Sequence, residues 1–103
     1  MRIISPKGGI MRSYELMAIF RTEEDAYQSA REALKTEITK HQGTVSKEEE
    51  LGERLLAYPI NKIGRGKYVL YNVTLNPDQV TLVSRNLTLN KSILRHLFVV
   101  TDK

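Results

Sequence analysis

Four stretches of the chain carry the period-two pattern of β-strands, and two of them are apolar on both alternating sets of side chains. The first of these two runs from Tyr14 to Phe20 and the second from Lys67 to Leu75. Because successive side chains of a strand point to opposite faces, a strand that is apolar on both faces is typical of the centre of a sheet. The stretches from Thr44 to Tyr58 and from Ser92 to Thr101 predict the two remaining strands.

Two other stretches carry apolar residues at helical spacing. The first runs from about Glu23 to about His41, after the capping hydroxyl of Thr22, and acidic residues at its start suit the positive end of a helix dipole. Gly43 can take the left-handed conformation that ends such a helix. The second begins at Asn76-Pro77, an N-cap followed by proline at the first helical position, where the missing N–H costs nothing. Val80, Val83 and Leu87 are predicted to form the apolar stripe of this second helix, and Asn90 is predicted to end it.

The stretch from Thr44 to Tyr58 differs along its length. Its first half contains Lys47 to Glu50, which is polar on both alternating sets and is therefore expected to be exposed. Gly52 suggests a bulge or a close backbone approach, and Pro59 cannot donate to a sheet ladder, so this strand should lie at a sheet edge. The segment from Asn61 to Gly66 predicts a hairpin loop too long for a two-residue turn.

The predicted elements follow in the order β-α-β-β-α-β. This order is typical of the α+β ferredoxin-like fold, a four-stranded antiparallel sheet with both helices on one face. Right-handed crossovers place the first and third strands in the middle and the second and fourth at the edges. Residues 11–103 are expected to form one such domain. Residues 1–10 show neither helical nor strand periodicity and are expected to form a disordered extension. On the last strand the alternation predicts one face with Leu94, Phe98 and Val100 and the other with Ile93, Leu97 and Val99.

Charge divides the chain into an acidic and a basic part. The formal net charge is +4, but the segment from Arg21 to Glu50 holds 5 basic and 8 acidic residues, a net of −3. The segment from Asn61 to Lys103 holds 7 basic and 2 acidic residues, a net of +5. Such asymmetry favours an oriented contact with nucleic acid over a uniform cationic coat. The chain has no Cys, no apolar run long enough to span a bilayer and no secretory leader, which predicts an intracellular protein.

Cations and an aromatic ring gather around the predicted edge strand. Arg54, Lys62, Arg65 and Lys67 stand beside Tyr58, a mixture that suits a structured RNA. The paired aromatic motifs of the RNA recognition motif are missing, so recognition of the RNA backbone is favoured over base stacking on a sheet platform. An edge strand kept soluble by its charges explains the same residues equally well.

Candidate catalytic and metal-binding groups are sparse. His41 and His96 are the only histidines, and neither has a neighbour at metal-ligand spacing. The carboxylates Glu48 to Glu50 are interpreted as a solvated strand face rather than as a Mg²⁺ or acid–base site. An acylphosphatase-type hydrolase is the sharpest alternative on this fold, but Arg21 to Asp25 supplies acids where a glycine-rich anion loop is needed. We therefore expect no enzymatic activity, no bound metal and no cofactor.

Several segments resemble the sixth protein of the bacterial small ribosomal subunit. Glu50-Leu51-Gly52, followed by Arg54 and the run Leu56-Ala57-Tyr58-Pro59-Ile60-Asn61-Lys62, is similar to the signature of that family. The resemblance covers roughly Met11 to Thr101, and the segments that support it elsewhere are Met11-Arg12-x-Tyr14-Glu15, Tyr68-Val69-Leu70, Asn72-Val73 and Leu94-Arg95.

The resemblance implies a structural protein of the small ribosomal subunit, in the cytoplasm or on an organellar ribosome. It also implies that the protein binds the central domain of the small-subunit RNA together with the eighteenth small-subunit protein. Partner docking is expected at the second strand and the open sheet face. Together, the resemblance and the charge pattern predict RNA or partner contacts at Arg12, Arg54, Tyr58, Lys62, Arg65, Lys67, Tyr68 and Arg95.

Overall fold

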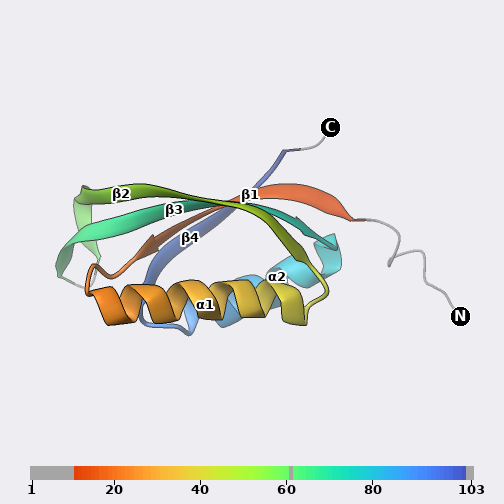
Figure 1. The fold of residues 1–103 in the computed structure, drawn as a ribbon, viewed down its shortest axis with the longest axis horizontal. Coiled ribbons are helices and arrows are strands. Elements are labelled where there is room, and N and C mark those ends of the chain that lie inside the picture. Colours follow the sequence, from red (N-terminus) through yellow and green to blue (C-terminus); the bar gives the residue numbers. More distant parts are fainter. Residues whose placement is uncertain (1–10, 61, 102–103) are drawn as a thin grey trace, which may run out of the picture.

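A computed structural model describes residues 11–60 and 62–101 of the chain (Figure 1). The expected extension at residues 1–10 lies outside the described residues. Within them, none of the helices is long and apolar enough to cross a membrane. The elements follow the predicted order and are β1 Arg12–Phe20, α1 Glu24–Lys40, β2 Thr44–Ile60, β3 Ile63–Leu75, α2 Pro77–Thr88 and β4 Ile93–Val100.

The four strands form one antiparallel sheet in the order β2-β3-β1-β4, and both helices cover the same face (Figure 1). This confirms the ferredoxin-like fold, with β1 and β3 in the middle. It also confirms that Pro59 lies on an edge strand, where its missing N–H interrupts no central ladder. The inner face of the sheet packs on the helices through one apolar core, which includes Leu16, Phe20, Leu34, Ile38, Val69, Val73, Val83 and Leu87.

Helix ends follow the predicted chemistry only in part. The predicted capping hydroxyl of Thr22 is wrong, because the N-cap of α1 is Glu23, whose side chain makes no capping hydrogen bond. Asn76 caps α2 as predicted, because its side-chain Oδ1 accepts a hydrogen bond of 2.8 Å from the Asp78 N–H. After α1, however, the left-handed residue is Gln42, with φ of 67°, and not Gly43 as predicted. Gly43 is needed for a different reason, since a Cβ there would lie 2.8 Å from the Thr74 carbonyl oxygen and 2.9 Å from an Ile38 methyl carbon. The connection therefore packs too closely on the sheet for a side chain.

The prediction of a long loop between β2 and β3 was wrong. Strand β3 begins at Ile63, which pairs with Ile60, so only two positions separate the strands and Gly64 to Gly66 belong to β3. Lys62, in this connection, has a positive φ of 67°. Because β1 pairs with β3 only as far as Lys67, the end of the β2–β3 hairpin projects beyond the rest of the sheet, at the left of Figure 1.

Two irregularities change which faces the edge strands present. At Gly52, with φ of +97°, a register shift in β2 confirms the expected bulge. On β4 the pairing passes from Phe20–Ile93 to Ile19–Arg95, so Ile93 joins the core while Arg95 lies on the opposite face. The predicted grouping of Ile93 with Leu97 and Val99 is therefore wrong.

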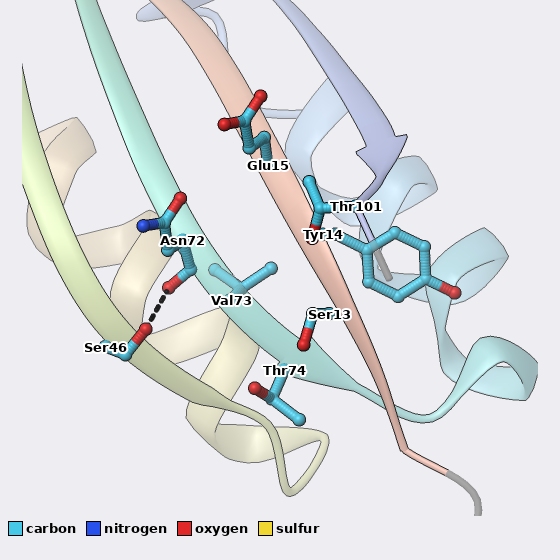
Figure 2. Close-up of a pocket in the computed structure, with 8 residues that line it drawn as sticks. All are labelled: Ser13, Tyr14, Glu15, Ser46, Asn72, Val73, Thr74 and Thr101. Atoms are coloured by element: carbon cyan, nitrogen blue, oxygen red, sulfur yellow. Dashed lines mark hydrogen bonds between the residues drawn. The ribbon is translucent and has the colours of Figure 1, made fainter. Parts of the chain in front are cut away.

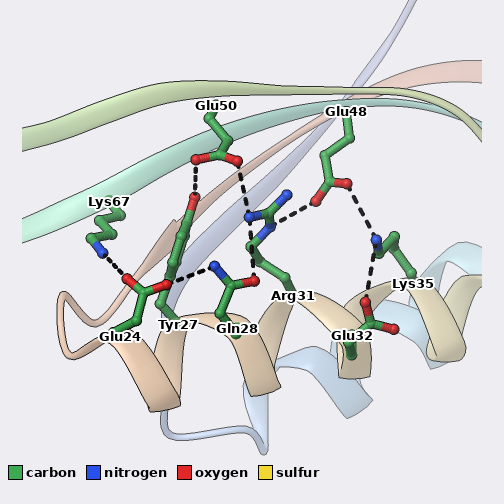
Figure 3. A network of polar contacts seen from close by, with 9 residues as sticks. All are labelled: Glu24, Tyr27, Gln28, Arg31, Glu32, Lys35, Glu48, Glu50 and Lys67. Carbon is green, nitrogen blue, oxygen red and sulfur yellow. Dashed lines mark hydrogen bonds and ion pairs between the residues drawn. The ribbon is translucent and has the colours of Figure 1, made fainter.

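In the acidic first half of β2, Lys47, Glu49 and Glu50 are exposed as predicted, but Glu48 and Glu50 are not merely solvated, because they bind helix α1. Glu48, whose side chain is 19% exposed, accepts hydrogen bonds from Arg31 Nε at 2.8 Å and Lys35 Nζ at 3.3 Å on α1 (Figure 3). Glu50 accepts one from Arg31 and one from the Tyr27 hydroxyl. Burial tends to raise the pKa of Glu48, but these charged hydrogen bonds outweigh it and hold the pKa below its ordinary value. The carboxylates therefore tie the edge strand to the helix.

Candidate nucleic-acid and partner interface

The projecting end of the hairpin carries two exposed residues of the predicted interface. Pairing runs from Leu55–Arg65 directly to Ile60–Ile63, so the four residues from Leu56 to Pro59 bulge opposite Gly64 alone. Tyr58 lies in this bulge and is 84% exposed. Lys62 is exposed at the turn. An aromatic ring and a cation are therefore both exposed at this end of the hairpin.

A second group of predicted residues lies on the open sheet face. Tyr68 and Arg95 both pair with Ile19, one from each side, so the three residues form a row across β3, β1 and β4. Two strand spacings separate Tyr68 from Arg95, which is about 10 Å. The Arg54 guanidinium lies over the Tyr68 ring, 6.0 Å from its centroid. A cation thus stands at each end of this row.

Two of the predicted cations are already engaged by carboxylates. Arg65 Nε donates to Glu53 Oε2 at 2.6 Å. Lys67 lies on the helix side, where its ammonium contacts Glu24 Oε1 at 3.1 Å and stands 4.3 Å from the centroid of the Tyr27 ring (Figure 3). Both interactions compete with binding to phosphate, so Arg54, Lys62 and Arg95 carry more of the available positive charge.

Arg12 lies at the other end of the sheet. It begins β1 and pairs with Leu75, whereas the hairpin joins the sheet beside Phe20, eight residues along the strand. At about 3.4 Å per residue, Arg12 is about 27 Å from that end. The structure therefore separates Arg12 from the cluster formed by the other predicted residues.

A polar hollow of about 350 Å³ near Arg12 contains none of the predicted residues (Figure 2). Hydroxyl and amide groups dominate its lining, and the Ser46 hydroxyl donates to the Asn72 carbonyl oxygen at 3.2 Å. Glu15 supplies a negative charge, and no cation is found among the described residues that line it. This hollow does not suit phosphate.

The two histidines make contacts inside the protein. His41 Nε2 lies 2.8 Å from Glu37 Oε2, and its Nδ1 lies 2.8 Å from Gln79, so the ring joins α1 to α2. His96 Nε2 lies 2.6 Å from the Ser84 hydroxyl, and burial lowers the pKa of His96. Within the described part of the chain, no carboxylate contacts His96 to orient it as a catalytic base for Ser84. Both histidines therefore serve packing between elements.

Sequence reasoning missed two cations that the fold brings to the hairpin end. Arg21 follows β1 and Lys91 precedes β4, and both line a groove of about 460 Å³ that Ile63 of the hairpin also borders. Neither residue lies in a motif, and the only signal for Lys91 was the basic excess of the last 43 residues. Their proximity depends on the β1–β4 pairing.

Comparison with known proteins agrees with this architecture. The model of the family described as ribosomal protein S6 matches residues 13–100 of the chain. The chain belongs to the ribosomal protein S6 family. This bears out the resemblance carried by the segment from Leu56 to Lys62, and it makes the chain a structural ribosomal protein rather than an enzyme.

Relatives within the family cover nearly the same length. The small ribosomal subunit protein bS6 of Treponema pallidum (strain Nichols) is 38% identical over 92 residues, which span 89% of this chain and 99% of the relative. The bS6 protein of Treponema denticola is 37% identical over 89 residues, spanning 86% and 96%. The crystal structure of 30S ribosomal protein S6 from Thermotoga maritima shares the fold, with a TM-score of 0.80, 23% identity and 89% coverage of each chain.

Proposed function

We propose that this S6 family member binds the central domain of the small-subunit RNA as a heterodimer with the eighteenth small-subunit protein, in the bacterial cytoplasm. The single observation that carries the RNA contact is the projecting hairpin, on which Tyr58 and Lys62 are exposed. Cations that project from a rigid scaffold can reach phosphates without a clash between RNA and the rest of the domain.

The open sheet face supports the partner contact. Met17 and Leu97 pair across β1 and β4 on this face, and Leu97 is 60% exposed. Val99, two residues along β4, is 46% exposed. An exposed apolar strip beside an unpaired strand edge is typical of a surface that another protein covers. The partner would dock on this strip and leave the hairpin free for RNA.

The charge distribution predicts that RNA binding depends on the partner. Arg65 and Lys67 are held by carboxylates, and the acids of α1 and β2 repel phosphate from the helical side. Few cations therefore remain to neutralise phosphates, and log affinity should fall with log salt by only about 0.9 for each contact made to a duplex. A basic partner would add contacts and steepen this slope.

The test is calorimetry with a central-domain RNA fragment across a salt series, with and without the eighteenth small-subunit protein. We expect Lys62→Glu to weaken RNA binding by the pair, with a loss that shrinks as salt rises, and to leave the urea midpoint unchanged. Lys47→Glu is the matched control, because Lys47 is exposed on β2 opposite Asn72, toward the other end of the sheet. Tight binding by this chain alone, unchanged when the partner is added, would contradict the proposal.

A further inference from the structure

The groove beside the hairpin is built from segments that are distant in sequence. Its walls come from Arg21 after β1, Ile63 at the start of β3, and the stretch that links α2 to β4. A second hollow of about 260 Å³ shares the wall around Ile93 and Leu94 and is also lined by Arg95. The two hollows are therefore neighbours, and together their linings include Arg21, Lys91 and Arg95.

Backbone hydrogen bonds shape this groove in the unbound protein. The Arg21 N–H donates to the Ser92 carbonyl oxygen at 2.9 Å, which holds the end of β1 against the stretch before β4. Asn90 orders the turn itself, because its side-chain oxygen accepts from the Ser92 N–H at 2.9 Å and its carbonyl from the Ile93 N–H at 3.0 Å. A ligand would therefore meet walls already in place, and binding would cost little loop ordering.

The lining combines positive charge with an apolar floor. Arg21 and Lys91 line the larger hollow and Arg95 the smaller, and the described residues that line either hollow include no carboxylate. Arg21 donates to Glu23 Oε1 at 3.2 Å and to Glu23 Oε2 at 3.4 Å, so phosphate must compete with a carboxylate for Arg21, as it must for Arg65, whereas Lys91 is exposed. The larger hollow is also lined by Ile63, which is half-buried, and by Ile93, which is 6% exposed.

We propose that this groove holds one unstacked nucleotide of the bound RNA, with its phosphate at Arg21 and Lys91 and its base against Ile63 and Ile93. The volume of about 460 Å³ falls within the range of small-ligand sites. Proteins recognise RNA largely through bases that loops and bulges splay out of the helix. The inference rests on the proposed RNA-binding function and adds a site to it, since neither Arg21 nor Lys91 belongs to the hairpin surface.

The first test follows methyl NMR signals of isoleucine residues while a short single-stranded oligouridylate is added. The signals of Ile63 and Ile93 should shift together, and that of Ile38, which is fully buried in the core, should stay in place. A parallel titration with uridine monophosphate shows whether the groove binds a nucleotide within an RNA strand or equally well a free nucleotide. Shifts at lower concentration with the oligonucleotide support an RNA site, whereas equal shifts with the monophosphate overturn it.

The second test compares three charge reversals, Lys62→Glu, Lys91→Glu and Lys47→Glu, in the same RNA titration. Lys91→Glu should lower affinity several-fold and reduce the salt slope by about 0.7, the contribution of one phosphate contact in a single strand. Lys47→Glu should cause a smaller loss. Lys91 is exposed, so its substitution should preserve the urea midpoint, and Lys91→Gln provides a milder variant.

The outcomes separate this inference from the function on which it rests. If Lys62→Glu weakens binding while Lys91→Glu behaves like Lys47→Glu and the signals of Ile63 and Ile93 do not move, the groove is not a nucleotide site and the hairpin contact stands. If no RNA binds to the chain or to its pair with the partner, both proposals fail.

Discussion

Gly66 and Gly64 offer a sharp test of how the hairpin joins the sheet. A Cβ on Gly66 would lie 2.5 Å from Ile19 Cγ2 and 3.5 Å from Leu56 Cδ2, whereas a Cβ on Gly64 would have nothing within 4 Å. Ile19 lies on the open face of β1 but is only 9% exposed. Gly66→Ala must therefore displace a confined, β-branched side chain, and Gly64→Ala displaces nothing.

The expected magnitudes follow from these contacts. Overpacking a filled site costs about 1 to 3 kcal/mol. Replacing glycine by alanine returns about 0.4 to 1 kcal/mol by restricting the unfolded chain, and neither Gly66 nor Gly64 has the positive φ that would penalise alanine. Because that gain applies to both variants, Gly66→Ala should be about 1 to 3 kcal/mol less stable than Gly64→Ala, which should itself be neutral or up to about 1 kcal/mol more stable than the parent.

Urea denaturation of both variants measures these differences, with the slope against urea as a check that the unfolded state is unchanged. Ile19→Ala removes the methyl group that Gly66→Ala would strike, so the double variant should show a favourable coupling of about 0.5 to 3 kcal/mol. Equal midpoints for the Gly66 and Gly64 variants, or additive effects with Ile19→Ala, would refute the packing described for this junction.

Two further predictions concern the core and the histidine on β4. Leu34 is fully buried between α1 and the sheet, so Leu34→Ala should lower the free energy of unfolding by about 2 to 5 kcal/mol, and an unmoved urea midpoint would contradict this placement. Burial lowers the pKa of His96, so the unfolded chain binds a proton more readily than the native protein, and stability should fall as pH drops below about 6.5. His96→Gln should flatten this part of the pH profile, and an identical profile in the variant would contradict the assignment.

Local chemistry in the sequence determined most of the elements and their order. Asn76-Pro77 starts α2 because a capping side chain and a restricted φ act within one turn, and Pro59 marks an edge strand because it lacks an N–H. The apolar residues on both alternating sets of β1 and β3 identified the central strands, because each is flanked by a strand on both sides and even an open-face residue such as Ile19 is only 9% exposed. These features depend on neighbours in the chain, so they are visible before folding.

The tertiary structure alone decided how distant segments meet. Glu48 is bound to helix α1 rather than solvated because Arg31, 17 residues earlier, lies opposite it once α1 packs on the sheet. Gly43 avoids a contact with the carbonyl oxygen of Thr74, and Ile93 turns into the core because β4 shifts its register against β1.

The proposed interface divides in the same way. The hairpin residue Lys62 stood out through its place in the Leu56–Lys62 segment, which resembles the family signature and lies within the residues that the family model matches. Arg21 and Lys91 are 70 residues apart, and only the antiparallel pairing of β1 with β4 brings them to one groove. The sequence shows that both residues are charged. It does not show that they lie together, because their proximity depends on a long-range strand pairing that local sequence patterns do not encode.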